Sequence, residues 1–203
     1  MDKQDIRRNY NQFAQWYDTV EIIPEWLGVR GLRRKLLKRA SGRTLEIACG
    51  TGLNFKMYSR EVDLVAVDLS EEMLKLAQHK ARSLNLNANF AVMDGERLAA
   101  KDQSFDTVIS SLSLCTFPNP LAALSEMARV CKYDGRIFLL EHGRSNYKWL
   151  GRWQNYRAYR HARLLGCQWN REPLELVRQS GLSLIHASRS FFGILHLIEA
   201  KPG

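Results

Sequence analysis

Long hydrophobic runs and paired cysteines are both missing from this sequence. No apolar stretch approaches the roughly 18 residues that cross a bilayer, and residues 1–5 lack the apolar core of a secretory signal, so we expect a cytoplasmic protein. Repeats and low-complexity tracts are absent as well. The cysteines show neither a CxxC nor a zinc-finger spacing, which predicts buried thiols and no metal site; they are Cys49, Cys115, Cys131 and Cys167.

The composition is that of a folded protein. Of the 203 residues, 45% are hydrophobic and 25% are charged, which is typical of one globular domain. We predict a single domain over residues 1–203. Its successive parts are two N-terminal cap helices within 1–40, a ligand-binding core over 44–142, a basic and aromatic insert over 143–171, and a closing helix and hairpin over 172–203.

Acidic residues are missing from two segments, 26–45 and 143–171, each of which contains seven Lys or Arg residues. Because these segments carry +14 and the whole chain +9, the rest of the sequence has a net charge of −5. Such local basic charge predicts an anionic partner. The second segment is also rich in Trp and Tyr, which suits the surface of an anionic membrane and a peripheral location. A solvated basic face is the alternative.

Apolar segments of two periodicities alternate along the chain. Strands are predicted at 44–49, 63–68, 88–93, 105–111, 135–141, 182–188 and 193–200, and helices at 5–20, 24–40, 54–59, 71–84, 120–130 and 173–180. This order predicts an α/β fold with a Rossmann-like, seven-stranded, mostly parallel sheet. Helices cover both of its faces, N-terminal helices cap it, and a C-terminal antiparallel hairpin closes it.

A glycine loop follows the first predicted strand, in the segment Glu46–Asn54. Gly50 and Gly52 allow the backbone to turn tightly and to approach a ligand closely, because neither residue has a Cβ atom. The predicted helix start that follows offers unpaired N–H groups. The loop therefore predicts a site for a small polar ligand.

Polar residues also end the next three strands. Asp68 is placed to accept hydrogen bonds from the ribose hydroxyls of a nucleoside, and Asp94, followed by Gly95, from an adenine amino group. Ser110 and Ser111 end the fourth strand. Because parallel strands end at one edge of a sheet, these residues are expected to converge on one crevice.

These segments, read in order, resemble the class I S-adenosylmethionine (SAM) dependent methyltransferases, and UbiE-like members in particular. The matching motifs are EIACGTG at 46–52, VAVDLS at 65–70, MDGERL at 93–98, SFDTVISSLSL at 104–114 and YDGRIFLLEH at 133–142. The resemblance implies SAM as cofactor, with Glu46, Gly50 and Gly52 around its methionine, Asp68 at the ribose, and Asp94 and Gly95 at the adenine. It also implies that Tyr17 lies over the cofactor. The other residues assigned to the cofactor site are Ala48, Asn54, Leu69, Met73 and Ser110.

Two later segments, Leu140–Ser145 and Leu165–Glu172, narrow the resemblance. They are similar to the thiol methyltransferase-like proteins of animals and their fungal mitochondrial relatives, and the core is similar to bacterial phosphatidylethanolamine N-methyltransferases. This likeness implies a small-molecule or lipid-like acceptor, such as a thiol, an amine or a phospholipid headgroup. The oligomeric state is not predicted.

Three alternatives remain open. A nicotinamide dehydrogenase would need a third glycine where Phe55 stands. A nucleic-acid methyltransferase would fit the basic charge, but Ser110–Ser113 replaces the [DN]PP[FY] box of the amino-methylating enzymes, so nucleic acid is not the partner that we expect. A non-catalytic SAM-binding assembly protein would bind the cofactor without turnover.

Methyl transfer is an in-line displacement, in which the protein mainly aligns the acceptor and excludes water. A general base is needed only when the acceptor arrives protonated. The candidates for catalytic roles are His142, Tyr10, Tyr17 and Tyr156, with Tyr159 and His161 as further possibilities.

Overall fold

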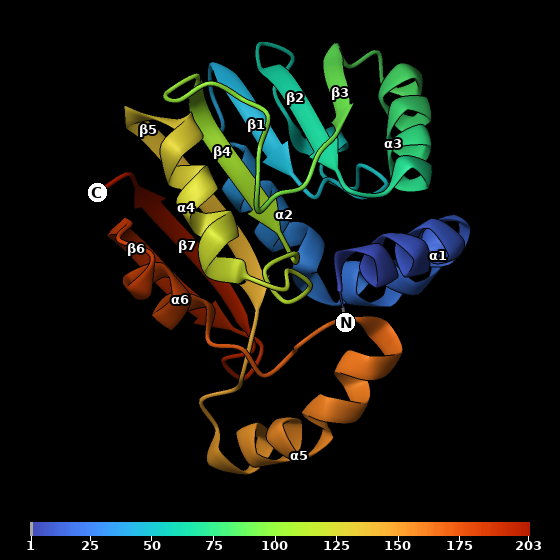
Figure 1. Cartoon of the computed structure of the whole chain (residues 1–203), viewed down its shortest axis with the longest axis vertical. Coiled ribbons are helices and arrows are strands. Elements are labelled where there is room, and N and C mark those ends of the chain that lie inside the picture. Colours follow the sequence, from blue (N-terminus) through green and yellow to red (C-terminus); the bar gives the residue numbers. More distant parts are fainter. Residues whose placement is uncertain (1) are drawn as a thin grey trace.

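The computed structural model describes residues 2–203, apart from the side chains of residues 161, 164 and 165. Within this part of the chain, seven strands form one sheet in the order β3-β2-β1-β4-β5-β7-β6 (Figure 1). The strands are β1 (Arg43–Ile47), β2 (Asp63–Asp68), β3 (Ala88–Val92), β4 (Phe105–Ser111), β5 (Cys131–His142), β6 (Ser183–Ser190) and β7 (Leu195–Lys201).

The sheet is parallel from β3 to β5, and β7 runs antiparallel to both of its neighbours. The central strands β1 and β4 are buried on both faces, so that their residues are buried in continuous runs rather than at alternate positions. The predicted mostly parallel, seven-stranded sheet with a closing hairpin is confirmed.

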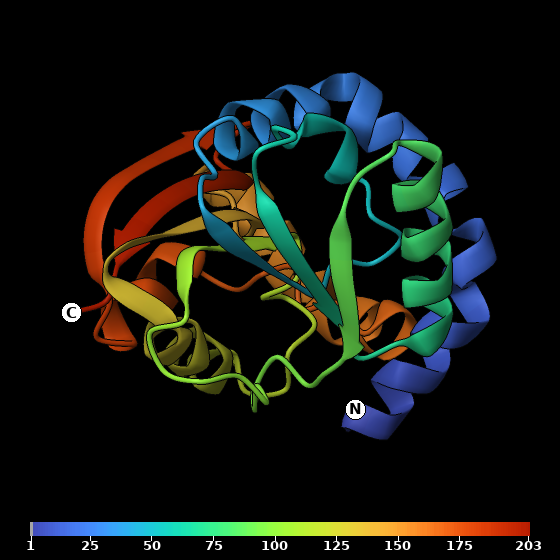
Figure 2. The same ribbon diagram turned by 90° about the horizontal axis from the view of Figure 1, so that it is seen from above.

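Helices cover both faces of the sheet, as Figure 2 shows from above. Helices α2 (Arg30–Leu37) and α3 (Glu71–Ser83) pack on one face, where Leu36, Leu74 and Phe138 share a buried cluster. Helices α4 (Pro120–Val130) and α6 (Pro173–Gln179) pack on the other face in a second cluster. Each cluster removes apolar surface from water and so supplies the main favourable term of folding.

The N-terminal cap differs from the prediction of two separate helices. Helix α1 (Lys3–Pro24) continues through a π-helical turn, η1 (Glu25–Val29), directly into α2. The bend lies at Gly28, whose φ of 128° is one that side chains rarely permit, and a Cβ atom there would lie 2.7 Å from the ring of Phe191. The break in the cap therefore lies at Gly28 rather than at residues 20–24.

The helix predicted at 54–59 is reduced to a single 3₁₀ turn, η2 (Phe55–Met57). Phe55 and Tyr58 are both buried here, and Tyr58 already has an extended backbone with φ of −70° and ψ of 145°. Tertiary burial of these two aromatic rings outweighs the weak helical preference of so short a segment.

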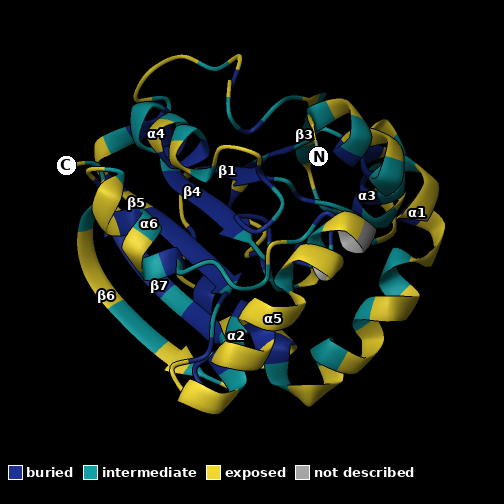
Figure 3. Cartoon of the chain, turned by 60° about the horizontal axis from the view of Figure 1, so that its bottom comes forward, coloured by how far each residue is buried: buried dark blue, intermediate teal, exposed yellow. Residues whose placement is uncertain are grey.

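The insert forms helix α5 (Lys148–Leu165), which lies beside the carboxyl edge of the sheet and ends at Gly166 with φ of 70° (Figure 1). Most of its described side chains are exposed (Figure 3). In the part of the chain that the structure describes, we find no helix with both the length and the apolar character to span a membrane.

Candidate cofactor and acceptor site

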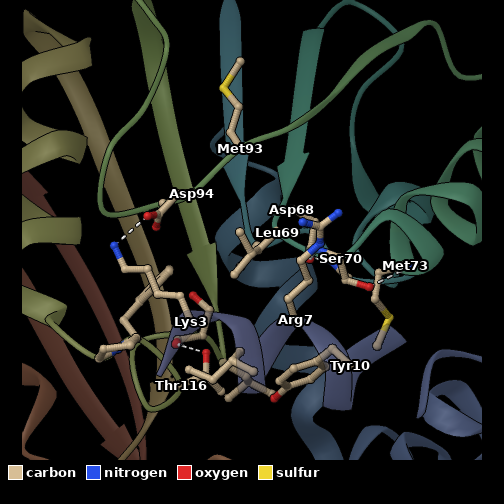
Figure 4. A pocket seen from close by; sticks show the side chains of 18 of the residues that line it. Lys3, Arg7, Tyr10, Asp68, Leu69, Ser70, Met73, Met93, Asp94 and Thr116 are labelled. Atoms are coloured by element: carbon tan, nitrogen blue, oxygen red, sulfur yellow. Dashed lines mark hydrogen bonds and ion pairs between the residues drawn. The ribbon is translucent and has the colours of Figure 1, made fainter. Parts of the chain in front are cut away.

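A cleft lies where the carboxyl ends of β1 to β4 meet helix α1 (Figures 1 and 4). Many of the predicted cofactor residues line it. The lining includes Tyr10, Tyr17, Ala48, Gly50, Asp68, Leu69, Met73, Asp94, Gly95 and Ser111. Local motifs that are far apart in the sequence thus reach one crevice because their strands are parallel neighbours.

The glycine loop turns sharply between β1 and η2. Gly50 has φ of 56° and lines the cleft, and its N–H donates to Oδ2 of Asp68 at 2.8 Å. Gly52 has φ of 79° and faces the core instead, where a Cβ atom would lie 2.5 Å from the ring of Phe55. Gly50 therefore borders the ligand space, whereas Gly52 shapes the turn from behind and is not part of the lining.

Asp68 ends β2 with its carboxylate at the floor of the cleft. Its Oδ1 accepts the N–H of Ser70 at 2.8 Å, so that backbone donors hold both oxygens in place. Burial raises the pKa of Asp68, and the N–H donors of Ser70 and Gly50 oppose that rise. Ser70 caps α3, and its hydroxyl contacts Oδ1 of Asn11 on α1 at 2.6 Å.

The loop after β3 borders one end of the cleft. Oδ2 of Asp94 is 2.6 Å from Nζ of Lys3, which also pairs with Glu96 at 2.7 Å (Figure 4). A Cβ atom at Gly95 would lie 2.8 Å from the ring of Phe117, so only glycine lets the loop approach this ring so closely. Lys3 was not predicted as a site residue, because the sequence shows no link between it and Asp94.

The buried Glu46 lies at the end of β1, behind the glycine loop. Its carboxylate accepts from Nδ2 of Asn54 and from the hydroxyl of Tyr58, each at 2.8 Å. Burial raises the pKa of Glu46 to about 7, although these two hydrogen bonds lower it. Glu46 and Asn54 line a narrow extension of the cleft together with Tyr17 and Gly50.

Arg33 also lines this extension, which corrects its prediction as part of the basic surface. The residue is 3% exposed, pairs with Glu25 at 2.6 Å and donates to Oδ1 of Asn54 at 3.0 Å. A charge is buried only where partners compensate it, and here those partners are Glu25 of η1 and Asn54 of the glycine loop. Sequence reasoning missed this role because Arg33 lies among six other bases.

Ser110 was predicted in the cofactor site, and the structure corrects this. It is fully buried, and its hydroxyl donates to Oε1 of Glu141 at 2.7 Å on the far side of β4. Neighbouring residues of a strand face opposite sides, so Ser111 lines the cleft instead. The hydroxyl of Ser111 accepts from Nδ2 of Asn54 at 3.1 Å.

Helix α1 closes the cleft like a lid. Polar contacts fasten it to the core: Arg7 pairs with Glu71 at 2.5 Å, and Asp18 pairs with Lys80 at 2.7 Å and contacts Thr51. The enclosed volume is about 80 Å³, whereas ligand pockets usually measure about 300–1,000 Å³. Side chains of α1 must therefore shift before a nucleoside cofactor can bind.

A second cavity of about 680 Å³ adjoins the cleft and shares Tyr10, Tyr17 and Leu112 with it. Its remaining lining comes from α1, α5, the end of β5 and the loops after β4 and α5. These residues are Asn9, Gln12, Phe13, Val20, Glu21, Cys115, His142, Arg163 and Cys167. A cavity of this size is large enough to hold a small molecule.

Two tyrosines separate the cleft from the second cavity. Burial raises the pKa of Tyr10 and the pKa of Tyr17 well above their usual values. Both phenols therefore hold their protons more strongly than an ordinary tyrosine does. A tyrosine ring in this position can stabilise a positively charged sulfonium by a cation–π contact.

His142 lies at the carboxyl end of β5 and lines the second cavity, as its prediction requires. Its Nε2 is 3.2 Å from Sγ of Cys167. Burial lowers the pKa of His142, but the contact with Cys167 and the charges of Glu141 and Glu21 outweigh it, so that the pKa lies above its ordinary value. Of the predicted catalytic residues that the structure describes at this cavity, only His142 belongs to a residue type whose ordinary pKa is near 7.

The remaining candidates for catalysis are on α5. Tyr156 is 85% exposed and lines neither the cleft nor the second cavity, so the structure does not bring this predicted catalytic residue to the site. Tyr159 is 74% exposed and stacks with Arg163. The side chain of His161 lies outside the described residues.

The fold and the site together define a nucleoside-cofactor enzyme, and comparisons with known proteins place it further. A methyltransferase domain model matches residues 45–139. The mitochondrial methyltransferase OMS1 of Saccharomyces cerevisiae is 32% identical over 98% of this chain and 46% of its own length, so this chain spans about half of the yeast protein. The phosphatidylethanolamine N-methyltransferase of Cereibacter sphaeroides is 37% identical over 70% of each chain.

A solved structure from Thermotoga maritima, described as a SAM-dependent methyltransferase, shares the fold. It is 18% identical, covers 98% of this chain and 100% of its own, and gives a TM-score of 0.72. The chain belongs to the SAM-dependent methyltransferases, and its cofactor is SAM. The residues present fit that cofactor, since Asp68, the Gly50 turn and Asp94 border one continuous cleft.

Proposed function

We propose that this protein transfers the methyl group of SAM to an amphipathic, lipid-like acceptor, which it collects from an anionic membrane surface. The observation that carries the proposal is the position of the second cavity. It is built between α1 and α5, and these two helices, together with η1, carry the exposed tryptophans of the described chain. An acceptor that enters this cavity passes between them.

The exposed apolar side chains form a surface that we call the apolar rim. Its members lie on α1 and η1, on α5 and in the turn between β6 and β7 (Figure 3): Trp16, Val20, Ile22, Ile23, Trp26, Leu27, Tyr147, Trp149, Trp153, Tyr156, Phe191 and Phe192. The parts of the rim touch one another. The ring of Phe191 contacts the bend at Gly28, and the rings of Phe192 and Tyr147 are 5.9 Å apart.

Basic side chains accompany the rim. Arg30 and Arg34 are exposed on α2, and Arg152, Arg157 and Arg160 are exposed on α5, whose sequence contains no acid. Each Lys or Arg near an anionic bilayer contributes about 1 kcal/mol, and aromatic rings favour the headgroup region. Rim and charge together match an anionic lipid surface.

Relatives with lipid substrates in their names support the proposal. They include the phosphatidylethanolamine N-methyltransferase already described, and a demethylmenaquinone methyltransferase of Deinococcus radiodurans that is 34% identical over 69% of this chain and 63% of its own. Phospholipids and quinone precursors are both amphipathic. Thiol, amine and phospholipid-headgroup acceptors all agree with the cavity.

The chemistry that we propose is a direct displacement. The bound cofactor supplies an electrophilic methyl group on a sulfonium. The neutral ring of Tyr17 faces that charge, α1 excludes water, and the cavity aligns the acceptor with the methyl group. His142 accepts the proton that a thiol or ammonium acceptor releases, because it is the imidazole that faces the cavity.

Co-sedimentation with vesicles tests the membrane part of the proposal. The wild-type chain is expected to bind vesicles that contain phosphatidylglycerol and to bind pure phosphatidylcholine weakly. Trp26→Ser combined with Trp149→Ser removes two rim side chains that are 83% and 69% exposed, and we expect at least 10-fold weaker binding.

The matched control is Tyr133→Ser. Tyr133 is 72% exposed but stands near the start of β5, at the opposite edge of the sheet. This variant should bind as the wild type does. Binding that ignores the anionic lipid, or that falls equally in the control and in the rim variant, contradicts the proposal.

A further inference from the structure

Three potential metal ligands meet in the wall of the second cavity. They are the thiols of Cys115 and Cys167 and the imidazole of His142, and their ligand atoms all lie within 4.8 Å of one another. The three residues come from the loop after β4, the end of β5 and the loop after α5. No sequence spacing links them, which is why the sequence predicts no metal site.

The two loops that carry the cysteines are held by hydrogen bonds. The carboxylate of Glu141 accepts the N–H groups of Ser113 and Leu114 at 2.9 and 3.0 Å, which fixes the loop before Cys115. The N–H of Gln168 donates to the carbonyl of Cys115 at 2.9 Å and so joins one cysteine loop to the other.

Arg171 also holds the loop after β4 in place. Its guanidinium donates to the carbonyl of Phe117 at 2.8 Å and also contacts the carbonyl of Leu114. The thiols and the imidazole thus stand on a braced frame rather than on independent loops. Preorganisation of this kind is what a metal site needs, because the ligands do not have to be ordered at the moment of binding.

The geometry points to a mononuclear zinc site formed by Sγ of Cys115, Nε2 of His142 and Sγ of Cys167. Bond lengths of about 2.3 Å to sulfur and about 2.0 Å to nitrogen place tetrahedral ligand atoms about 3.5–3.8 Å apart. The observed 3.2 Å between Nε2 and Sγ of Cys167 and the upper limit of 4.8 Å for the set bracket these values. Thiolate and imidazole are the ligands that Zn²⁺ favours.

The fourth position of this zinc site faces the second cavity. All three ligand residues line that cavity, and three protein ligands with one open position are typical of catalytic rather than structural zinc. A thiol is the kind of acceptor that such a position favours, because binding to the metal releases the thiol proton to solvent, and His142 then acts as a ligand instead of as a base. This consequence for the acceptor rests on the proposed function, whereas binding of the metal does not.

The test is a titration of the full chain, reduced and freed of metal under anaerobic conditions, with Co²⁺ alone and then with Zn²⁺. We expect one Co²⁺ per chain, with the charge-transfer absorption of thiolate ligands, and its displacement by Zn²⁺. Cys115→Ser, Cys167→Ser and His142→Asn should each weaken binding at least 100-fold. Cys131→Ala is the matched control, because Cys131 is equally buried but lies at the start of β5.

A second readout keeps the inference testable if a ligand variant folds poorly. In the wild type, Zn²⁺ should slow the alkylation of Cys115 and Cys167, measured by peptide mass spectrometry, and leave that of Cys49 and Cys131 unchanged. Absence of stoichiometric binding in the folded wild type would overturn the zinc site. So would cobalt spectra that persist unchanged in both serine variants, or a Cys115–Cys167 disulfide whose reduction does not create metal binding.

The metal site and the cofactor site fail independently. Asp68→Ala should abolish binding of SAM and leave the cobalt titration unchanged, whereas Cys115→Ser should do the reverse. A chain that binds cobalt but not SAM would keep this inference and refute the proposed function.

Discussion

The cofactor cleft and the second cavity, which we propose as the acceptor site, adjoin at Tyr10 and Tyr17, but they are built differently. The cleft is assembled from strand ends whose polar groups are held by nearby backbone donors, as at Asp68 and Gly50. The cavity is assembled from α1, α5, the end of β5 and two loops, and it shares Val20 with the apolar rim. We therefore expect cofactor binding to depend on the sheet, and the choice of acceptor to depend on the segments that pack over it.

Removal of the Asp68 carboxylate should have the largest effect, and that effect should be on the cofactor cleft rather than on the second cavity. Asp68→Ala should weaken SAM binding by about 4 kcal/mol, close to 1,000-fold, because two hydrogen bonds to a charged group are lost. Calorimetry measures the change. Asp63→Ala, on the exposed first residue of the same strand, should bind as the wild type does. Equal affinities in both variants would place the nucleoside elsewhere.

Glu46 should make the free energy of unfolding depend on pH. Its pKa of about 7 in the folded chain exceeds its ordinary value of 4.5, so between these values the folded state holds a proton that the unfolded chain has released. The free energy of unfolding therefore falls as pH rises through this window. Relative to Glu46→Gln, the wild type should lose about 2–3 kcal/mol between about pH 5 and pH 7.5.

Denaturant unfolding of both proteins at the two pH values tests this effect. Other titrating groups cancel in the difference between wild type and Glu46→Gln. Parallel curves for the two proteins would show that Glu46 is ionised in the folded chain throughout the window.

The turn behind the cleft should be less tolerant than an open helix. Gly52→Ala forces a left-handed residue to carry a Cβ atom against Phe55, which should reduce the free energy of unfolding by about 2 kcal/mol. Gly31→Ala is the matched control, since a Cβ atom there meets nothing within 4 Å and helix propensity favours alanine. If both variants lose stability equally in guanidinium, Gly52 does not shape the turn.

The lid should show the smallest effect. Asp18→Ala removes the contacts of α1 with Lys80 and Thr51, and a partly exposed pair of this kind is worth about 1 kcal/mol or less. Dissociation of SAM, followed by stopped flow, should accelerate about threefold. Asp5→Ala breaks only a pair within α1 and should leave the rate unchanged. A rate unaltered by Asp18→Ala would mean that α1 does not gate the cleft.

Local patterns predicted the sheet, its closing hairpin and the glycine loop. Each of these depends on a few neighbouring residues and on the rule that parallel strands end at one edge. Most of the predicted cofactor residues, from Ala48 to Gly95, accordingly line the cleft. Such patterns predict structure well because the hydrophobic period and the turn residues are local properties of the sequence.

The remaining errors arise where tertiary structure decides. The alternation of side chains along β4 places Ser111, and not Ser110, at the cleft. Arg33 is buried and so does not belong to the basic surface, and Tyr156 lies on an exposed side of α5. The cluster of Cys115, His142 and Cys167 joins three loops whose proximity no spacing reveals. Each outcome depends on which side of an element meets its neighbour, and a single sequence does not fix that.

Transfer of a labelled methyl group from SAM to lipid tests the central claim most directly, namely that the polar cleft delivers methyl to the cavity beside it. The full chain would be incubated with vesicles that contain anionic lipid and a mixed lipid extract, and the organic phase would then be counted. We predict label in the organic phase that Asp68→Ala abolishes and that the rim variant Trp26→Ser with Trp149→Ser reduces. Label that stays in the aqueous phase although SAM is bound would contradict the account.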